Sequence, residues 1–285
     1  MKSAGRPLKP QRIVGIVRYS LLLERGNFFP AAADVAPEDF ARRILDPKRL
    51  ERRFQMFSEV CLPSLAAQTD RDFNVVLVTS RLLPRVWIRR LERLLAKTDN
   101  VRLRVFRAES NISRVHRRAA FEVLDTEADA VATFRLDDDD ALSRDFIATL
   151  RQFTTPAYTG HAITFVPGYE LVLTGAEMAL KINKRQKASA GLATITTGPF
   201  EKAEKLWTVY TAGAHRQIDK VAPLEVVEGP PRFLQTAHGF NVSERSGGWS
   251  NEPASAAEIA AEIREGFPAL TADRLARLHA LCRVG

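Results

Sequence analysis

The sequence contains few of the residues that mark a disulfide-bonded or membrane-spanning protein. It has only two cysteines, Cys61 and Cys282, and their positions give neither a disulfide framework nor a metal-ligand spacing. We expect both to be buried and reduced. The longest apolar runs, such as residues 74–79, fall far short of the roughly 20 residues that a membrane-spanning helix needs, and residues 1–12 contain no apolar signal segment. These absences predict a cytoplasmic protein.

Aromatic residues are scarce where positive charge collects. Of the 285 residues, 42 are basic and 34 are acidic, which gives a net charge of +8, and only 8% are aromatic. The basic clusters at residues 42–43, 48–53, 114–118 and 181–187 contain almost no aromatic side chains. A nucleic-acid surface would interleave such rings to stack bases, so we expect no nucleic-acid partner. The charge suits a diphosphate ligand or peripheral contact with an anionic membrane.

The first half of the chain has the pattern of a doubly wound α/β fold. Hydrophobic residues make up 45% of the sequence, which is enough for a sizeable core. Strands are predicted at residues 13–17, 73–79, 101–106 and 130–136, and helices at about 50–65, 84–97 and 112–124. Apolar strands that alternate with helices are typical of a mostly parallel sheet with flanking helices. Pro63 is expected to kink the first of these helices near its end.

Beyond residue 153 the pattern becomes mixed. Short strands are predicted at residues 161–166, 169–174, 192–196 and 224–227. The first two are expected to form a hairpin around Pro167 and Gly168. Near the C-terminus, Ser255 with Glu258 gives a capping-box signature for one helix, and Thr271 opens a second.

Four adjacent aspartates, at positions 137–140, follow the predicted strand at residues 130–136. The carboxyl ends of such strands are where open α/β sheets bind ligands. Adjacent carboxylates repel one another unless a cation or backbone donors compensate them. Mg²⁺ or Mn²⁺ takes one or two carboxylates and completes its shell with water and substrate phosphates. The run therefore predicts a metal site, and the alternative is a solvated acidic turn before the next helix.

Three segments of the sequence resemble known glycosyltransferases. Residues 134–142 resemble the DxD region of GT-A fold glycosyltransferases. The stretch from Arg53 to residue 79 is similar to the first helix and second strand of the putative rhamnosyltransferase family, and residues 234–243 resemble that family's C-terminal motif. Together the matches extend over roughly residues 13–243. The resemblance implies a GT-A fold: a mostly parallel sheet with flanking helices and a mixed second half.

The resemblance also implies roles for individual residues. Asp137 corresponds to the first DxD aspartate, which contacts the nucleoside, and Asp138 is grouped with it at the donor site. Asp139 corresponds to the second DxD aspartate, which binds the metal ion. His238 occupies the place of a further metal ligand. The implied cofactor is Mn²⁺ or Mg²⁺.

Three more residues are expected at the donor. Arg18 leaves the first strand at the same sheet edge, and Arg114 lies early in the helix before the aspartate strand, so both can balance a diphosphate. Tyr19 could stack on the nucleobase. A solvated or packing role is the alternative for each. Lys184 and Lys187 could form a basic flap over the phosphates, although a surface loop explains them equally well.

A catalytic base is predicted at His215, four residues before Asp219. On an α-helix this spacing would put both on one face, where Asp219 could orient the imidazole. The base would remove the proton from the acceptor hydroxyl, and inversion at the anomeric carbon would follow. The alternative is a salt network on a surface helix.

These residues together predict a metal-dependent glycosyltransferase that moves a sugar, rhamnose by the family's label, from a nucleotide-sugar donor to a glycan, lipid-linked or other hydroxyl acceptor. Residues 1–245 would form the catalytic domain, with a donor half at about 12–153 and an acceptor half at about 154–245. Residues 246–285 would be a helical appendage.

Two other functions remain open. A sugar-phosphate nucleotidyltransferase would need a glycine-rich phosphate loop after the first strand, where Arg18, Tyr19 and Ser20 stand instead. A non-catalytic GT-A-like binding module would keep the scaffold without its chemistry.

Overall fold

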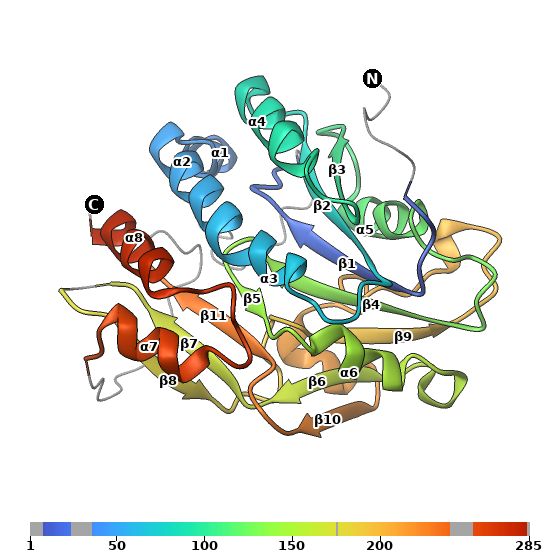
Figure 1. Ribbon diagram of the computed structural model, residues 1–285. Helices are drawn as coiled ribbons and strands as arrows, with labels where there is room; N and C mark the ends of the chain where they lie inside the picture. The colour runs from blue at the N-terminus through green and yellow to red at the C-terminus, as the bar shows by residue number, and fades with distance from the viewer. Residues whose placement is uncertain (1–7, 24–35, 175, 240–252, 284–285) are drawn as a thin grey trace.

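The computed structural model describes residues 8–23, 36–174, 176–239 and 253–283, and it forms two β-sheets flanked by helices (Figure 1). The larger sheet has seven strands in the order β10-β6-β9-β4-β1-β2-β3, and the smaller has four in the order β5-β11-β7-β8. The predicted class is confirmed: a mostly parallel sheet, flanking helices and a mixed second half.

The first half supplies four parallel strands of the larger sheet. They are β1 (Ile13–Arg18), β2 (Asn74–Ser80), β3 (Val101–Phe106) and β4 (Ala130–Asp137). The helices between them are α1 (Pro37–Ile44), α2 (Pro47–Met56), α3 (Leu62–Ala66), α4 (Arg85–Leu95) and α5 (Ile112–Phe121). Each predicted strand is confirmed to within a residue or two, and β1, β2 and β4 are buried along almost their whole length, as expected for inner strands of a parallel sheet.

Alternate residues of these strands pack into two different hydrophobic clusters. Ile13 and Val17 of β1 face the helices α2, α3 and α4, whereas Val14 and Ile16 face α5. Between them, Gly15 lies against Phe134 of β4, and a Cβ at Gly15 would come within 2.4 Å of that ring. The sheet is therefore a central layer with helices on both faces.

The helix before β2 is not continuous. A π-helical turn, η2 (Phe57–Cys61), separates α2 from α3, and Pro63 lies in the first turn of α3. Proline has no N–H to donate to the preceding turn, and π-turns are frequent at functional sites. The expected irregularity thus occurs one turn before Pro63.

The second half contributes strands to both sheets. They are β5 (Ala141–Leu142), β6 (Ala162–Val166), β7 (Gly168–Val172), β8 (Ala179–Asn183), β9 (Ala193–Thr197), β10 (Leu224–Glu228) and β11 (Phe233–Ala237). The predicted hairpin around Pro167 and Gly168 is wrong, because β6 joins the larger sheet and β7 the smaller. Pro167 cannot donate to a strand ladder, and Gly168 has no positive φ that a tight hairpin turn would use.

Helix α6 (Phe146–Phe153) follows β5, and two helices cover the smaller sheet: α7 (Ala256–Ile263) and α8 (Ala272–Arg283) (Figure 1). The predicted capping box of Ser255 and Glu258 is present at the start of α7. Ile259 and Leu278 pack with Tyr169 of β7 in one hydrophobic cluster. The C-terminal helices thus share a core with the second half, and the boundary at residue 245 stays a prediction.

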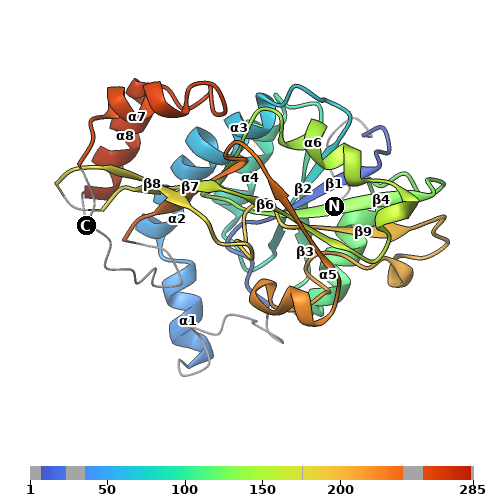
Figure 2. The same cartoon turned by 90° about the horizontal axis from the view of Figure 1, so that it is seen from below.

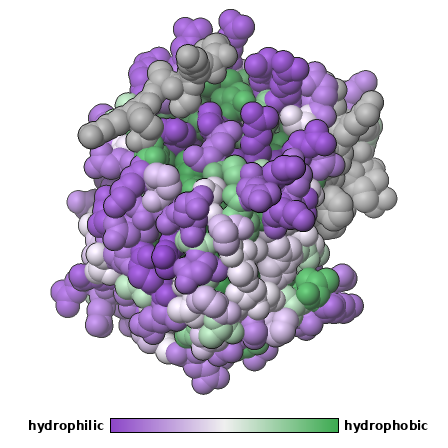
Figure 3. Space-filling model, turned by 90° about the vertical axis from the view of Figure 1, so that its right-hand side faces the viewer, coloured by the Kyte–Doolittle hydropathy of each residue, from purple (hydrophilic) through white to green (hydrophobic). Residues whose placement is uncertain are grey.

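The remaining surface offers few apolar features. Helix α1 projects from the body of the molecule (Figure 2), and the face at the amino-terminal ends of the parallel strands is covered mainly by hydrophilic side chains (Figure 3). Within the described ranges, no helix is both long enough and apolar enough to span a bilayer. Cys61 is buried, Cys282 is half-buried, and both thiols are free.

Candidate functional site

The four aspartates form a tight turn at the carboxyl end of β4. The backbone N–H of Asp140 donates to the carbonyl of Asp137 at 3.1 Å, which closes the turn with Asp138 and Asp139 as its central residues. Strands β1 and β4 are in register with Arg18 beside Asp137. The turn therefore presents the run at the sheet edge, where the sequence analysis expected it.

Three of the four carboxylates are buried and compensated within the protein. Asp138 is fully buried and forms an ion pair with Arg53 of α2. The same guanidinium donates to Oδ2 of Asp139 at 2.6 Å. Asp140 accepts from the backbone N–H of Thr236 at 3.0 Å and from the amide of Gln235 at 3.3 Å. Repulsion within the run is thus relieved by an internal cation and by β11.

This arrangement corrects two expectations for the donor site. Asp138 was predicted to bind the donor, but its carboxylate has no exposed surface and contacts Arg53. Tyr19 was predicted to stack on a nucleobase, but its ring is buried edge-on against Phe57 and its hydroxyl donates to the carbonyl of Leu50 at 3.4 Å. Burial raises the pKa of Tyr19. Both residues support the fold beneath the turn.

The two predicted metal ligands lie side by side. Nε2 of His238, at the end of β11, is 2.9 Å from Oδ2 of Asp139, and both side chains are nearly inaccessible. The contact is a hydrogen bond at this distance, and two adjacent ligands of an octahedral ion with metal–ligand distances of roughly 2.1 Å also lie about 3 Å apart, so the spacing is compatible with one divalent cation. Within the described residues, no third His, Cys, Asp or Glu completes a protein-only donor set. Phosphate and water oxygens would have to fill the other positions.

Asp137 is the open end of the run. Its side chain keeps 28% exposure and has arginines on two strands beside it, with Oδ1 lying 3.4 Å from Arg135 and 3.9 Å from Arg18. Ser189 donates to its other oxygen at 3.4 Å. Burial acts to raise the pKa of Asp137, but Arg135 and Arg18 outweigh it and the pKa is lowered.

An aromatic residue holds the two arginines in place. The guanidinium carbons of Arg18 and Arg135 lie 4.7 Å and 4.9 Å from the centre of the Tyr210 ring. His116 of α5 stacks on Tyr210 with ring centres 4.2 Å apart. Burial, with both arginines nearby, lowers the pKa of His116 well below its usual range. His116 is therefore a neutral packing partner of this cationic cluster.

The predicted base lies near the open end. His215 begins a 3₁₀-helix, η5 (His215–Lys220), and is half-buried. Burial lowers the pKa of His215 to about 4, with Arg135 contributing and Asp137 opposing. Its imidazole is thus within electrostatic reach of Asp137 and is neutral at pH 7.

Asp219 does not orient His215 as predicted. Residues four apart do not share a face on a 3₁₀-helix, which has three residues per turn. Asp219 is exposed and instead pairs with Lys187 at 2.9 Å, an interaction that lowers the pKa of this aspartate. This ion pair also gives Lys187 a structural partner, while Lys184 is exposed.

Arg114 lies in the first turn of α5 and is exposed. Its backbone N–H donates to the capping side chain of Asn111 at 3.2 Å. None of its described contacts joins it to the aspartate turn, so its role at the donor stays a prediction. The motif residues Asn241, Val242 and Ser243 lie outside the described residues.

No chemical role was predicted from the sequence for Arg53, Arg135, Tyr210 or Gln235. Arg53 lies in the stretch that resembles the rhamnosyltransferase family, and Arg135 lies two residues before Asp137. The sequence around each of these residues could therefore have indicated a role at the site. Tyr210 and Gln235 come from segments far along the chain, and only the three-dimensional fold brings them to the turn.

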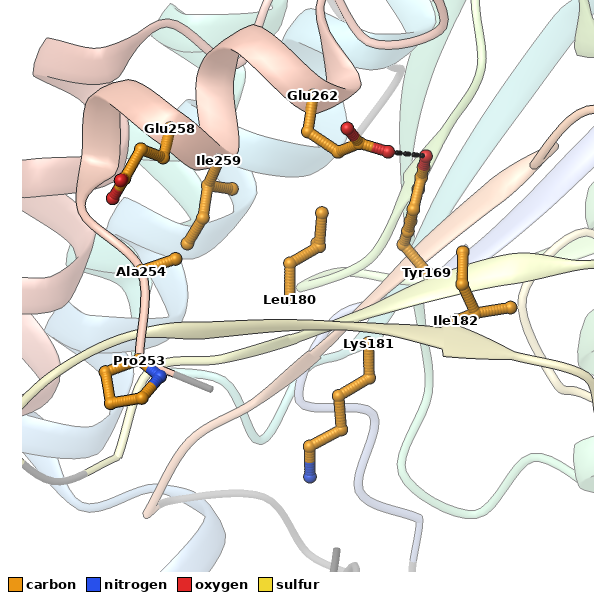
Figure 4. A pocket seen from close by; sticks show the side chains of 9 residues that line it. All are labelled: Tyr169, Leu180, Lys181, Ile182, Pro253, Ala254, Glu258, Ile259 and Glu262. Carbon is orange, nitrogen blue, oxygen red and sulfur yellow. Dashed lines mark hydrogen bonds between the residues drawn. The ribbon is translucent and has the colours of Figure 1, made fainter. Parts of the chain in front are cut away.

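A separate cavity of about 430 Å³ lies between β8 of the smaller sheet and α7 (Figure 4). Leu180 and Ile259 line it, and the hydroxyl of Tyr169 donates to Glu262 at 3.3 Å. Lys181 points to the opposite side of β8 in the same view. The cavity contains none of the predicted site residues.

Comparison with solved structures gives remote similarities. Residues 1–349 of S. aureus TarS are 13% identical at a TM-score of 0.40, and the match covers 95% of this chain and 70% of that one. The same part of TarS in complex with UDP is 14% identical at a TM-score of 0.42, covering 80% of this chain and 61%, less than two thirds, of that one. A putative glucose-1-phosphate thymidylyltransferase from Bacillus anthracis, in complex with a sucrose, is 12% identical at a TM-score of 0.38, covering 96% of each chain.

No curated protein sequence matches this chain. A family does match: residues 12–249 fit the family described as putative rhamnosyl transferase. That span includes the aspartate turn, Arg53, His215 and His238, and it is far more than half of the chain. The chain therefore belongs to the putative rhamnosyl transferase family.

Proposed function

We propose that this protein is a metal-dependent glycosyltransferase, which moves a sugar from a nucleotide-sugar donor to an acceptor hydroxyl. Family membership supports a transferase. The observation that carries the metal dependence is the pairing of Asp139 with His238 at 2.9 Å at the carboxyl edge of the sheet. Rhamnose is the sugar that the family's description suggests.

Asp139 and His238 would hold the Mn²⁺ or Mg²⁺ ion. Carboxylate and imidazole together suit Mn²⁺, and Mg²⁺ is usually held by one or two carboxylates plus phosphates. When bound, the ion would neutralise charge on the departing nucleoside diphosphate. Arg53 already donates to Oδ2 of Asp139 at 2.6 Å, so this oxygen would be shared between Arg53 and the ion.

The open end of the turn supports donor binding. Asp137 is the aspartate with exposed surface, and its carboxylate can accept a hydrogen bond from a ribose hydroxyl. Arg18 is partly exposed beside it and can donate to a phosphate oxygen. The ring of Tyr210 holds the guanidinium groups of Arg18 and Arg135 in position.

His215 is the proposed base. Because its pKa is lowered to about 4, the imidazole is neutral at pH 7 and can accept the proton of an acceptor hydroxyl. The same shift makes it a weaker base than an ordinary histidine, so positioning must supply much of its effect. Loss of that proton would let the hydroxyl oxygen attack the anomeric carbon with inversion.

The test is a screen of nucleotide-sugars for release of free nucleoside diphosphate, with and without Mn²⁺, in the presence and absence of candidate acceptors. Metal-dependent release that rises when an acceptor is added supports the proposal. Asp139→Asn is the matched variant, since it keeps the size of the side chain and removes its charge. It should lose the metal-dependent release.

Two outcomes would contradict the proposal. Binding of a nucleotide-sugar with no release under any condition would indicate a non-catalytic binding module. Formation of a nucleotide-sugar from a sugar phosphate and a nucleoside triphosphate would indicate a nucleotidyltransferase.

A further inference from the structure

A second cavity, of about 390 Å³, reaches Gly239, the residue that follows His238. Its described lining consists of Arg42 and Arg43 of α1, Asp46 and Arg49 at the start of α2, and Gly239. Three of these five residues are arginines and one is an aspartate. We call this cavity the arginine pocket.

The arginine pocket is short of negative charge. Arg42 pairs with Asp39 at 2.6 Å on the outside of α1. The carboxylate of Asp46 caps α2 by accepting from the backbone N–H of Arg49 at 2.8 Å. In the part of the chain that the structure describes, neither Arg43 nor Arg49 forms an ion pair.

Arg49 is the most informative of the three arginines. Its guanidinium donates to the carbonyl of Ile44 at 2.9 Å and to Oγ of Ser20 at 3.3 Å, both neutral acceptors. Burial lowers the pKa of Arg49 to about 9. A half-buried cation without an anionic partner is costly, and a bound anion would remove that cost.

The contacts of Arg49 also hold it in a defined geometry. Ser20, which follows the end of β1, has a φ of +40°, unusual for a residue with a side chain. Such strain is often found at ligand sites, where the surrounding structure fixes it. The hydrogen bond from Arg49 to Ser20 therefore ties the pocket to the end of β1.

The pocket is linked to the proposed reaction centre through neighbouring residues. Gly239 directly follows His238, and Arg49 lies one helical turn before Arg53, which contacts Asp139. The charge of Asp139 also acts to raise the pKa of Arg49, against the effect of burial. In contrast, Arg18 and Arg135 approach the turn from β1 and β4, at Asp137.

We propose that the arginine pocket binds a phosphate group carried by the acceptor. The binding of an anion follows from the pocket alone, whereas its assignment to the acceptor rests on the proposed function. A planar guanidinium recognises phosphate through paired charge-assisted hydrogen bonds. A phosphate held there would direct the rest of the acceptor toward the aspartate turn.

The test uses inorganic phosphate as the probe, in chelator and without nucleotide, so that it is independent of donor binding. Melting temperature is followed against phosphate concentration, with chloride added to keep ionic strength constant. The wild-type protein should show a saturable rise. Arg43→Gln should raise the half-saturating concentration about tenfold or more, since it removes one charge-assisted contact.

Lys48→Gln is the matched control, because Lys48 is an exposed cation on α2 that does not line the pocket. It should leave the phosphate response unchanged. Arg49→Gln should weaken phosphate binding as Arg43→Gln does. If Arg49→Gln fails to fold, Arg43→Gln still tests the pocket, because Arg43 is exposed and its loss should not affect folding. If phosphate raised the melting temperature of all variants equally, or raised it no more than chloride does, the arginine pocket would not be the anion site.

A second arm separates the acceptor from the donor. With a nucleoside diphosphate and Mn²⁺ at saturation, phosphate should still raise the melting temperature, and the two effects should add. Competition between them would mean that the arginines bind the donor's diphosphate, which would overturn the assignment to the acceptor. If no nucleoside diphosphate binds, the proposed function fails while the phosphate arm still decides whether the pocket binds an anion.

Discussion

Asp137 and Asp140 lie at the two ends of one four-residue turn, yet their surroundings differ. Asp140 is fully buried and accepts hydrogen bonds from the backbone of Thr236 and the amide of Gln235. Asp137 keeps 28% of its side chain exposed and has Arg18 and Arg135 beside it. The closed end joins the two sheets, and the open end is accessible to a ligand.

This difference changes how an acidic run should be interpreted. Four adjacent aspartates do not by themselves require a metal ion, because Arg53 and β11 compensate three of them within the protein. What favours a metal is the single contact between Asp139 and His238 in the middle of the turn.

Removing Arg53, the cation that compensates the two central aspartates, should have the largest effect. Arg53→Met leaves Asp138 and Asp139 buried without their partner and should lower the free energy of unfolding by about 3–5 kcal/mol. Urea denaturation measures the change. Arg89→Met, which removes an exposed arginine of α4, should change stability by less than about 0.5 kcal/mol. A loss below about 1 kcal/mol for Arg53→Met would show that the run is not held by this ion pair.

At the open end, His215→Ala should lower the rate of sugar transfer about a hundred-fold to ten-thousand-fold while leaving donor affinity nearly unchanged. Transfer rate and donor dissociation constant are measured on the same preparation. A wild-type transfer rate in the variant would make His215 a structural residue.

The pH dependence of transfer gives a second check on His215. A base must be unprotonated, so the rate should be flat from pH 6 to 8 and fall as the pH drops through the pKa of about 4. An inflection near pH 6.5 that disappears in His215→Ala would instead show an ordinary histidine exposed to solvent.

The contact in the middle of the turn is tested by His238→Ala. It should weaken Mn²⁺ binding by at least about tenfold, since even the outer partners of metal ligands contribute that much. Calorimetric titration with Mn²⁺ measures the affinity. His161→Ala, a half-buried histidine before β6, is the control and should bind Mn²⁺ like the wild type. Equal affinities in all three proteins would remove His238 from the metal site.

The smallest expected effect is on stability at the open end. Arg18 helps to lower the pKa of Asp137, and a lowered carboxyl pKa stabilises the fold above the unfolded-state pKa of about 3.9. Arg18→Gln should therefore cost stability at pH 6, by less than about 1 kcal/mol for a partly exposed pair 3.9 Å apart. The difference should vanish as the pH falls and Asp137 becomes protonated. A constant difference down to pH 2.5 would mean that Arg18 acts through packing on Tyr210.

The sequence predicted the first half of the fold better than the second. Strands such as β1 and β2 are buried and mostly apolar, and they alternate with helices along the chain, so their pattern was clear. Strands β8 and β11 were not predicted, because β8 carries Lys181 and exposed Ile182 and β11 mixes Gln235 with Thr236. Which sheet a short strand joins depends on partners far along the chain. The hairpin at Pro167 was wrongly predicted because β6 and β7 pair with such distant strands in two different sheets.

For the site, the sequence placed the aspartates correctly at the sheet edge but could not assign their partners. Nothing local shows that Arg53 pairs with Asp138, since 85 residues separate them. The spacing of His215 and Asp219 predicted a shared face only if the segment were an α-helix, and it forms a 3₁₀-helix instead. Tyr19 follows a strand that ends at the site, yet its side chain points into the core.

The most direct test of the account is the metal dependence of donor binding. The dissociation constants of a panel of nucleoside diphosphates are measured by calorimetry with Mn²⁺ and with chelator, for the wild-type protein and for Asp139→Asn. At least one nucleoside diphosphate should bind the wild type tightly only with Mn²⁺, and Asp139→Asn should bind it weakly under both conditions. Equal binding with and without Mn²⁺ in the wild type, unaltered by Asp139→Asn, would contradict the assignment of Asp139 and His238 as metal ligands.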